Sequence, residues 1–314
     1  MRANLKISIT ASSAIIISFL LLVFFLVIFP DPTYVSEKRF YSSKFDSKDK
    51  IFIIGSSHTG NLNATLINEQ IQGSGNYIVY NLSYDSDKPS KRLRTINEII
   101  NLKPQIIFYG VSYNEFQSIT YDEVKTSPNP SYIQNILLKN IGFDFSNPQF
   151  VTLQFIRESQ KYLGVYAKID YLMQPYTPFF EYHARQFIIE NNLDIENEFL
   201  KTKKEIIVNP PQVNQELTIL KKMISEFQKH KIKVVVFTTP YHRAFLNSLS
   251  DNQKETFEAI LNDLQNDSNV TIYRLDQKYA DLSIWYDVSH VSYNENSMIY
   301  SEDLANLIVS KIEQ

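Results

Sequence analysis

The sequence predicts a doubly wound α/β domain built around a five-stranded parallel sheet. Two observations predict it. Short, continuous apolar runs alternate along the chain with amphipathic stretches of helical length. These apolar runs lack the polar alternation of a half-exposed strand, which is typical of strands covered on both faces. The alternation stops in the middle of the chain and resumes near its C-terminus, which indicates an insertion.

Five short runs are predicted to form the strands, and the first of them leads into a Gly-Ser-Ser turn. They are Ile51–Ile54, Tyr77–Leu82, Ile106–Tyr109, Lys233–Thr239 and Val270–Leu275. In such a sheet, right-handed crossovers and short turns bring the carboxyl ends of the strands to one edge. We therefore expect a flavodoxin-like three-layer sandwich with its site at that edge.

The stretches between these runs carry apolar residues at helical spacing and are predicted to be helices. They are Asn61–Ile71, Lys91–Leu102, Leu217–His230, Gln253–Leu264 and Ser301–Ile312. Residues 116–212 form the insertion, which is rich in Tyr, Phe, Asn and Pro. We expect it to be mostly helical, and it could shape a substrate pocket, pack against the sheet or bind a partner.

The N-terminal segment predicts a membrane anchor. Residues 7–29 contain no charged side chain, and a helix of that length is about 34 Å long, enough to cross a bilayer. Arg2 and Lys6 precede it, so the N-terminus is expected in the cytoplasm and the main domain outside. The segment is longer than a cleaved signal peptide. The predicted order is anchor (1–30), linker (31–50) and domain (51–314).

The composition excludes several classes of function. A formal net charge of −3 argues against nucleic acid as a partner. The chain has no cysteine, which excludes disulfides, thiolate metal sites and a Cys nucleophile. It has no glycine-rich phosphate loop and no His spacing typical of metal sites, so neither a cofactor nor a metal is expected. The basic run Lys88–Arg94 is interpreted as the solvated start of a helix.

The first predicted strand ends in Gly55-Ser56-Ser57, and Asp287-Val288-Ser289-His290 stands before the last predicted helix. A serine at a strand-to-helix turn exposes its hydroxyl at the carboxyl edge of the sheet. A His paired with an Asp can remove the proton from that hydroxyl. The alternative is purely structural: small residues make a tight turn, and Ser57 caps the helix.

These two motifs resemble the outer two motifs of SGNH/GDSL hydrolases, although the family commonly has Asp at the middle position of the first. The resemblance covers residues 51–114 and 217–312. It implies that Ser57 is the nucleophile, His290 the general base and Asp287 the residue that orients the base.

The family also implies oxyanion donors from a Gly after the second strand and an Asn after the third. Here Ser83 follows the second strand instead. After the third strand Ser112 is the direct positional match, and Asn114 could supply the amide if the loop is longer by two residues. His58 and His242 are further candidates for substrate contacts. Each has a structural alternative, His58 as a helix cap and His242 as a satisfied loop histidine.

The leading expectation is a membrane-anchored serine esterase or O-acyltransferase that acts outside the cytoplasm. Anchoring favours an acylated cell-envelope glycan or a lipid-linked ester as its substrate. The sequence leaves hydrolysis and transfer open. A second hypothesis is an inactive envelope protein that keeps the fold and binds glycan or a protein partner. In a third, Asp287 and His290 form only a structural pair in an interaction scaffold.

Overall fold

The computed structural model describes residues 40–41, 47–84, 86–117, 192–202, 206–292 and 295–313 of the 314-residue chain. The chain divides into two compact units, Met1–Lys44 and Phe45–Gln314. The predicted anchor, most of the linker and most of the predicted insertion lie outside the described residues. Within the described residues, no helix combines the length and apolar character that a membrane crossing requires.

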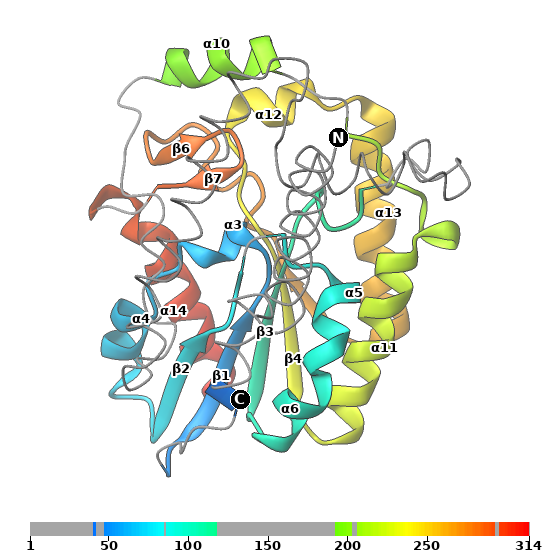
Figure 1. Cartoon of the computed structure of the whole chain (residues 1–314). Helices are drawn as coiled ribbons and strands as arrows, with labels where there is room; N and C mark the ends of the chain where they lie inside the picture. The colour runs from blue at the N-terminus through cyan, green and yellow to red at the C-terminus, as the bar shows by residue number, and fades with distance from the viewer. Residues whose placement is uncertain are drawn as a thin grey trace, which may run out of the picture. The chain divides into compact units, whose positions relative to one another are not determined.

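Five parallel strands form one sheet, as predicted, and their order in it is β2-β1-β3-β4-β5 (Figure 1). The strands are β1 (Asp49–Ile54), β2 (Tyr77–Asn81), β3 (Ile106–Val111), β4 (Lys233–Thr238) and β5 (Thr271–Tyr273). The chain runs from β1 outward to β2 and then crosses back to β3. The direction of the chain therefore reverses between β1 and β3, and in doubly wound sheets ligands commonly bind at the carboxyl ends of the strands beside such a reversal.

The central strands are apolar because both of their faces are covered. Every residue of β3 is buried, and so are the last four residues of β1. Ile53 pairs with Phe108 between these strands, and Phe108 pairs with Val235 of β4. The continuous apolar runs in the sequence thus correspond to strands packed between two helix layers.

The helices lie on both faces of the sheet (Figure 1). The described α-helices are α3 (Ser57–Gly60), α4 (Ala64–Ile71), α5 (Pro89–Arg92), α6 (Ile96–Asn101), α10 (Asn192–Thr202), α11 (Gln215–Lys229), α12 (Arg243–Ser248), α13 (Asp251–Ser268) and α14 (Met298–Ile312). Helices α4 and α14 pack together on one face, and α11 packs between α5 and α13 on the other. Helix α10 contacts α12 and belongs to neither layer.

The predicted helix over residues 91–102 differs from the observed structure. It begins at Pro89 and is interrupted by a 3-10 turn at Leu93–Thr95, which separates α5 from α6. Pro89 is favourable in a first turn because it has no N–H to leave unpaired. The apolar spacing continues through the 3-10 turn, so the pattern predicted one longer helix.

One residue of the basic run departs from its interpretation as a solvated helix start. Lys91 and Arg94 are exposed, but Arg92 is fully buried. Its guanidinium forms an ion pair with the buried Asp87 and donates a hydrogen bond to the Leu82 carbonyl oxygen. Arg92 therefore fixes the loop that follows β2.

A two-stranded antiparallel hairpin follows the sheet, formed by β6 (Trp285–Asp287) and β7 (His290–Val291). The sequence predicted only a loop here. Asp287 pairs with His290 across the hairpin, and Val288 and Ser289 form its turn. The three-residue spacing of the Asp-x-x-His motif is therefore the spacing of a tight hairpin.

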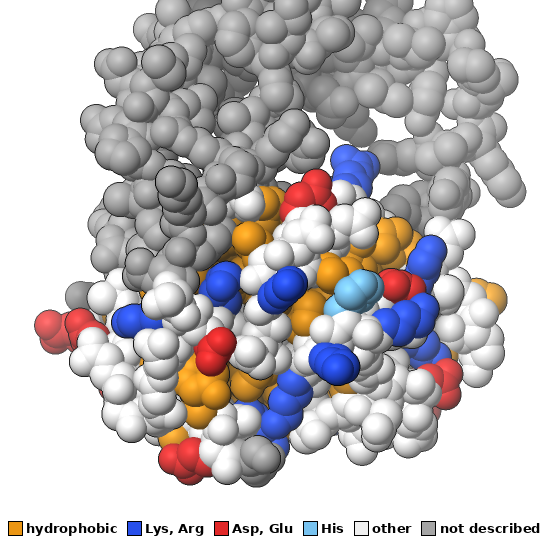
Figure 2. Space-filling model, turned by 90° about the horizontal axis from the view of Figure 1, so that it is seen from below, with side chains coloured by type: hydrophobic (Ala, Val, Ile, Leu, Met, Phe, Trp, Pro, Cys, Tyr) orange, Lys and Arg blue, Asp and Glu red, His pale blue; other side chains and the backbone are white. Residues whose placement is uncertain are grey.

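The opposite edge of the sheet carries the amino ends of the strands. Seen from below, this face shows Lys and Arg side chains interspersed with acidic, apolar and uncharged polar ones (Figure 2). His230, at the end of α11, is exposed and lies near the amino end of β4. We interpret this edge as a mixed, solvated surface.

Candidate active site

Ser57 stands where β1 passes into α3. Gly55 makes the turn and lies close to both Thr59 and β3. A Cβ atom at Gly55 would meet the Thr59 hydroxyl at 2.6 Å and the Gly110 carbonyl oxygen at 3.1 Å. Glycine is therefore required for the close approach of the two strand ends. Ser57, the first residue of α3, is left partly buried at the carboxyl edge of the sheet.

The structure brings the three predicted residues together. Ser57 Oγ lies 2.8 Å from His290 Nε2, although the two residues are 233 positions apart. The other ring nitrogen of His290, Nδ1, lies 2.8 Å from Asp287 Oδ2 and 2.9 Å from Oδ1. When Nδ1 donates its proton to the carboxylate, Nε2 can accept the proton of the serine hydroxyl. This is the arrangement of a nucleophile, a base and the residue that orients the base.

Asp287 is held by the hairpin turn as well as by the imidazole. Its Oδ1 accepts hydrogen bonds from the main-chain N–H groups of Ser289 at 2.8 Å and His290 at 2.9 Å. The Ser289 hydroxyl also donates to Oδ1, at 3.0 Å. Burial raises the pKa of the Asp287 carboxyl group. The hydrogen bond from His290, the charge of His290 and the hydrogen bonds from Ser289 outweigh burial and lower this pKa to about 2. The carboxylate is therefore ionised at neutral pH.

The hairpin is fixed to the domain through a buried tryptophan of its own first strand. Trp285 is fully buried, and its indole N–H donates to the Tyr279 carbonyl oxygen at 3.2 Å. Asn61, which follows α3, donates a side-chain hydrogen bond to the Val291 carbonyl oxygen and so joins the serine turn to β7. Asn61 was not among the predicted site residues, because a single Asn in the sequence does not indicate such a contact.

His242 supports the same hairpin from the loop after β4. Its main-chain N–H donates to the Val288 carbonyl oxygen at 3.0 Å, and its ring packs edge-on against Trp285, 5.9 Å between centroids. Ring atom Nδ1 accepts the Ala244 N–H at 3.1 Å and caps α12. Burial lowers the pKa of His242. These contacts correspond to the satisfied loop histidine that the sequence left open as an alternative.

The serine candidates for an oxyanion hole are both engaged in internal hydrogen bonds. The Ser83 hydroxyl accepts a bond from Thr59 Oγ1 at 2.6 Å, and its main-chain N–H donates to Asn81 Oδ1. Ser112 is fully buried, and its hydroxyl donates to Glu115. Both hydroxyls are therefore used in hydrogen bonds to residues other than Ser57 and His290.

Asn114 and His58 lie beside the triad. Asn114 Nδ2 is 3.4 Å from His58 Nε2. The His58 ring stacks on that of His290, with centroids 4.7 Å apart and planes within 2°. Its Nδ1 lies 2.9 Å from Ser56 Oγ. Glu115, which follows Asn114, is buried. It was not among the predicted site residues, although its position next to Asn114 could have indicated it.

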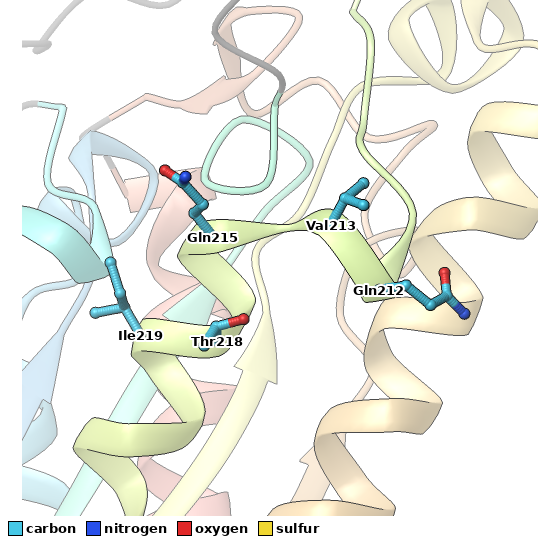
Figure 3. Close-up of a pocket in the computed structure, with 5 residues that line it drawn as sticks. All are labelled: Gln212, Val213, Gln215, Thr218 and Ile219. Atoms are coloured by element: carbon cyan, nitrogen blue, oxygen red, sulfur yellow. The ribbon is translucent and has the colours of Figure 1, made fainter.

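Among the described ranges, no group of three or more His, Asp and Glu side chains is arranged to bind a metal ion. A pocket of about 350 Å³ opens at the start of α11 (Figure 3). It is lined by Gln212, Val213, Gln215, Thr218 and Ile219, so no triad residue contributes to it.

No model of a known protein family matches the chain, and no curated protein matches its sequence significantly. Solved structures do match it. A lipase/acylhydrolase from Enterococcus faecalis is 14% identical to this chain, with a TM-score of 0.43. The match covers 84% of this chain and 95% of the lipase/acylhydrolase chain. The psychrotrophic esterase EstA from Pseudoalteromonas sp. is 8% identical to this chain, with a TM-score of 0.44. The match covers 85% of this chain and 100% of the EstA chain.

An acetylxylan esterase, Axe2 from Geobacillus stearothermophilus, matches as a catalytic mutant at 12% identity with a TM-score of 0.42, covering 84% of this chain and 95% of its own. The predicted five-stranded parallel sheet is shown by the strand order of the chain itself. The activities belong to the matched proteins.

Proposed function

We propose that this chain is a serine esterase or O-acyltransferase that uses Ser57, His290 and Asp287. The observation that carries the proposal is the continuous path from the Ser57 hydroxyl through the His290 ring to the Asp287 carboxylate. Asp287 stabilises the imidazolium that forms when His290 takes the serine proton. A purely structural Asp–His pair would not require a serine hydroxyl at the other ring nitrogen.

The reaction begins when Ser57 Oγ attacks the carbonyl carbon of an ester and gives its proton to His290 Nε2. The tetrahedral intermediate carries a negative oxygen. The main-chain N–H of Ser57 and the side-chain amide of Asn114 are the donors we assign to it. Collapse expels the alcohol, which takes the proton from His290 and leaves an acyl group on Ser57. Water or a sugar hydroxyl then gives its proton to His290 and attacks the acyl carbon. The bond between that carbon and Ser57 Oγ breaks, and Ser57 takes the proton back from His290.

A non-catalytic binding protein is the second candidate. Ser83 and Ser112 stand where the family has its additional oxyanion donors, and both are tied up in internal hydrogen bonds. An oxyanion hole with fewer donors would stabilise the intermediate less. In this case the same edge of the sheet would bind an acylated glycan or a protein partner without turnover.

A fluorophosphonate probe, which reacts with activated serines, separates the two. We expect the detergent-purified full chain to be labelled, Ser57→Ala to be unlabelled, and His290→Gln to label at least 100-fold more slowly. Ser310→Ala and His230→Gln, both at the opposite edge of the domain, are the matched controls and should label like the parent. A folded parent protein that does not label, or a labelled Ser57→Ala, excludes the esterase proposal.

We further propose that residues 7–29 anchor the chain and place residues 51–314 outside the cytoplasm, with an acylated envelope glycan or lipid-linked ester as substrate. The uncharged length of the segment and the positive charge before it support this orientation. Because the chain has no cysteine, single-cysteine variants report topology without background. A membrane-impermeant maleimide should label Glu255→Cys in intact spheroplasts and Asn4→Cys only after permeabilisation. The reverse result excludes the outward orientation.

A further inference from the structure

The nucleophile and the base of the proposed triad lie on separate elements, α3 and the β6–β7 hairpin. The hydrogen bond between Ser57 and His290 cannot hold these elements together through a reaction, because Ser57 gives up its hydroxyl proton in the first step. The acylated Ser57 oxygen has no proton to donate, yet His290 must stay in place to accept a proton from the second nucleophile. The base therefore needs contacts that the reaction does not consume.

The ring of His58 covers one face of the His290 ring. The two centroids lie 4.7 Å apart and the planes within 2° of each other, which is a parallel stack. Asp287 and Ser57 contact His290 only at its ring nitrogens, in hydrogen bonds of 2.8 Å each. Contacts at the edge of a ring do not prevent it from tilting out of its plane. A flat ring packed against its face does.

His58 is itself held on several sides. The residue is 5% exposed. Its Nδ1 lies 2.9 Å from Ser56 Oγ, and its Nε2 lies 3.4 Å from Asn114 Nδ2. The Tyr241 ring packs on it as well, with centroids 5.6 Å apart and planes tilted by 49°. With contacts at both ring nitrogens and little exposed surface, His58 is better placed to hold a neighbouring ring than to bind a substrate.

Asn61 holds the main chain of the same strand. Its side-chain amide donates a hydrogen bond to the carbonyl oxygen of Val291, the residue after His290. Asn61 is 5% exposed, so water competes little for this bond. One short helix and the residue that caps it thus contact β7 at three points, through Ser57, His58 and Asn61.

We propose that His58 and Asn61 are positioning residues that hold His290 against Ser57 throughout the reaction. His58 acts through the face of its ring, and Asn61 acts through the carbonyl oxygen of Val291. This inference rests on the proposed function of Ser57 and His290. Neither positioning residue is assigned a proton transfer or a bond to the substrate. The role of His58 therefore requires a flat ring, whereas a role in hydrogen bonding would require its nitrogens.

Two variants of His58 separate the ring from its nitrogens. In the detergent-purified full chain, His58→Gln keeps polar atoms but loses the ring. We expect it to slow fluorophosphonate labelling of Ser57 by about 100-fold, through misplacement of the base. His58→Phe keeps a flat ring without nitrogens and should label at least about 10-fold faster than His58→Gln. Equal rates for the two variants, or faster labelling of His58→Gln, overturn the role of the ring.

A matched pair of asparagines tests the second contact. Asn68 of α4 donates a side-chain hydrogen bond to the Val79 carbonyl oxygen of β2 at 2.9 Å. Asn61→Ala and Asn68→Ala each remove such a bond between two elements, so both should lower the unfolding temperature. Only Asn61→Ala should slow the labelling of Ser57, by at least about 10-fold. Equal labelling rates for the two variants overturn the role of Asn61.

Failure of the positioning roles is distinguishable from failure of the proposed function. A folded parent that does not label excludes the proposed function, and the positioning roles with it. A parent that labels, with variants that do not follow the expected order, excludes the positioning roles alone. Far-UV circular dichroism identifies the variants that fold. His58→Tyr replaces His58→Phe, and Asn61→Leu replaces Asn61→Ala, where the first variant does not fold.

Discussion

Asp287 accepts hydrogen bonds from both the ring and the main chain of His290. His290 Nδ1 lies 2.8 Å from Oδ2, and the His290 main-chain nitrogen lies 2.9 Å from Oδ1. Both donors belong to a residue three positions along the same hairpin. The carboxylate therefore fixes the rotation of the ring and the nitrogen that carries its proton, independently of the rest of the sheet.

The first prediction concerns the charge of this carboxylate. Asp287→Asn keeps the shape of the side chain but can present an NH2 group to Nδ1, which then favours the ring proton on Nε2, opposite Ser57. We expect labelling by the fluorophosphonate to slow by roughly 10⁴-fold at neutral pH. Asp251→Asn, exposed at the start of α13, should label like the parent. Parent-like labelling of Asp287→Asn would show that the pair does not orient the base.

The second prediction concerns stability in acid. The pKa of Asp287 is about 2 in the folded chain, below its ordinary value of 3.8. Stability from a depressed pKa is present above the unfolded value and is lost as the pH falls through the folded one. The unfolding free energy of the parent should therefore fall toward that of Asp287→Asn between about pH 4 and about pH 2.

Urea titrations followed by circular dichroism at three pH values measure this convergence. The side chain is 42% exposed, so solvent screening keeps the effect small. A difference between the two proteins that stays constant over this interval would rule out the assigned pKa.

The third prediction separates two neighbouring arginines. Arg92→Ala removes the cation that neutralises the buried Asp87 and should lower the unfolding free energy by about 3–5 kcal/mol. Arg94 is exposed, and Arg94→Ala should change the unfolding free energy by less than about 0.5 kcal/mol. Urea denaturation measures both. Equal effects of the two changes would contradict the burial of Arg92.

The fourth prediction compares two glycines. A Cβ atom at Gly110 would overlap the Thr59 methyl group and meet the Phe237 ring at 3.0 Å. Gly110→Ala should therefore destabilise the fold by about 1–3 kcal/mol. Gly73 has no atom within 4 Å of such a Cβ, and Gly73→Ala should be close to neutral. Denaturation curves that coincide for the two variants would contradict the close contact of α3 with β3.

The sheet could be predicted because buried parallel strands leave continuous apolar runs, as in the fully buried β3. The Ser57–His290 contact could be predicted because both motifs fall at the carboxyl edge of such a sheet. Its catalytic role remains a prediction.

Other features depend on contacts that leave no local pattern. The burial of Arg92 is set by Asp87, five positions earlier in an irregular loop. Asn61 donates to the carbonyl oxygen of Val291, which lies 230 positions later in the chain. The β6–β7 hairpin is too short for strand periodicity, with three and two residues in its strands.

Trp285 is the single tryptophan of the chain, and it is a buried residue of β6, the hairpin strand that also carries Asp287. The indole emission of the whole protein therefore arises from one fluorophore at this position. Acylation of the serine, or displacement of the hairpin, would change the surroundings of that fluorophore. The molecule thus carries its own optical reporter of events at the proposed base, with no added label.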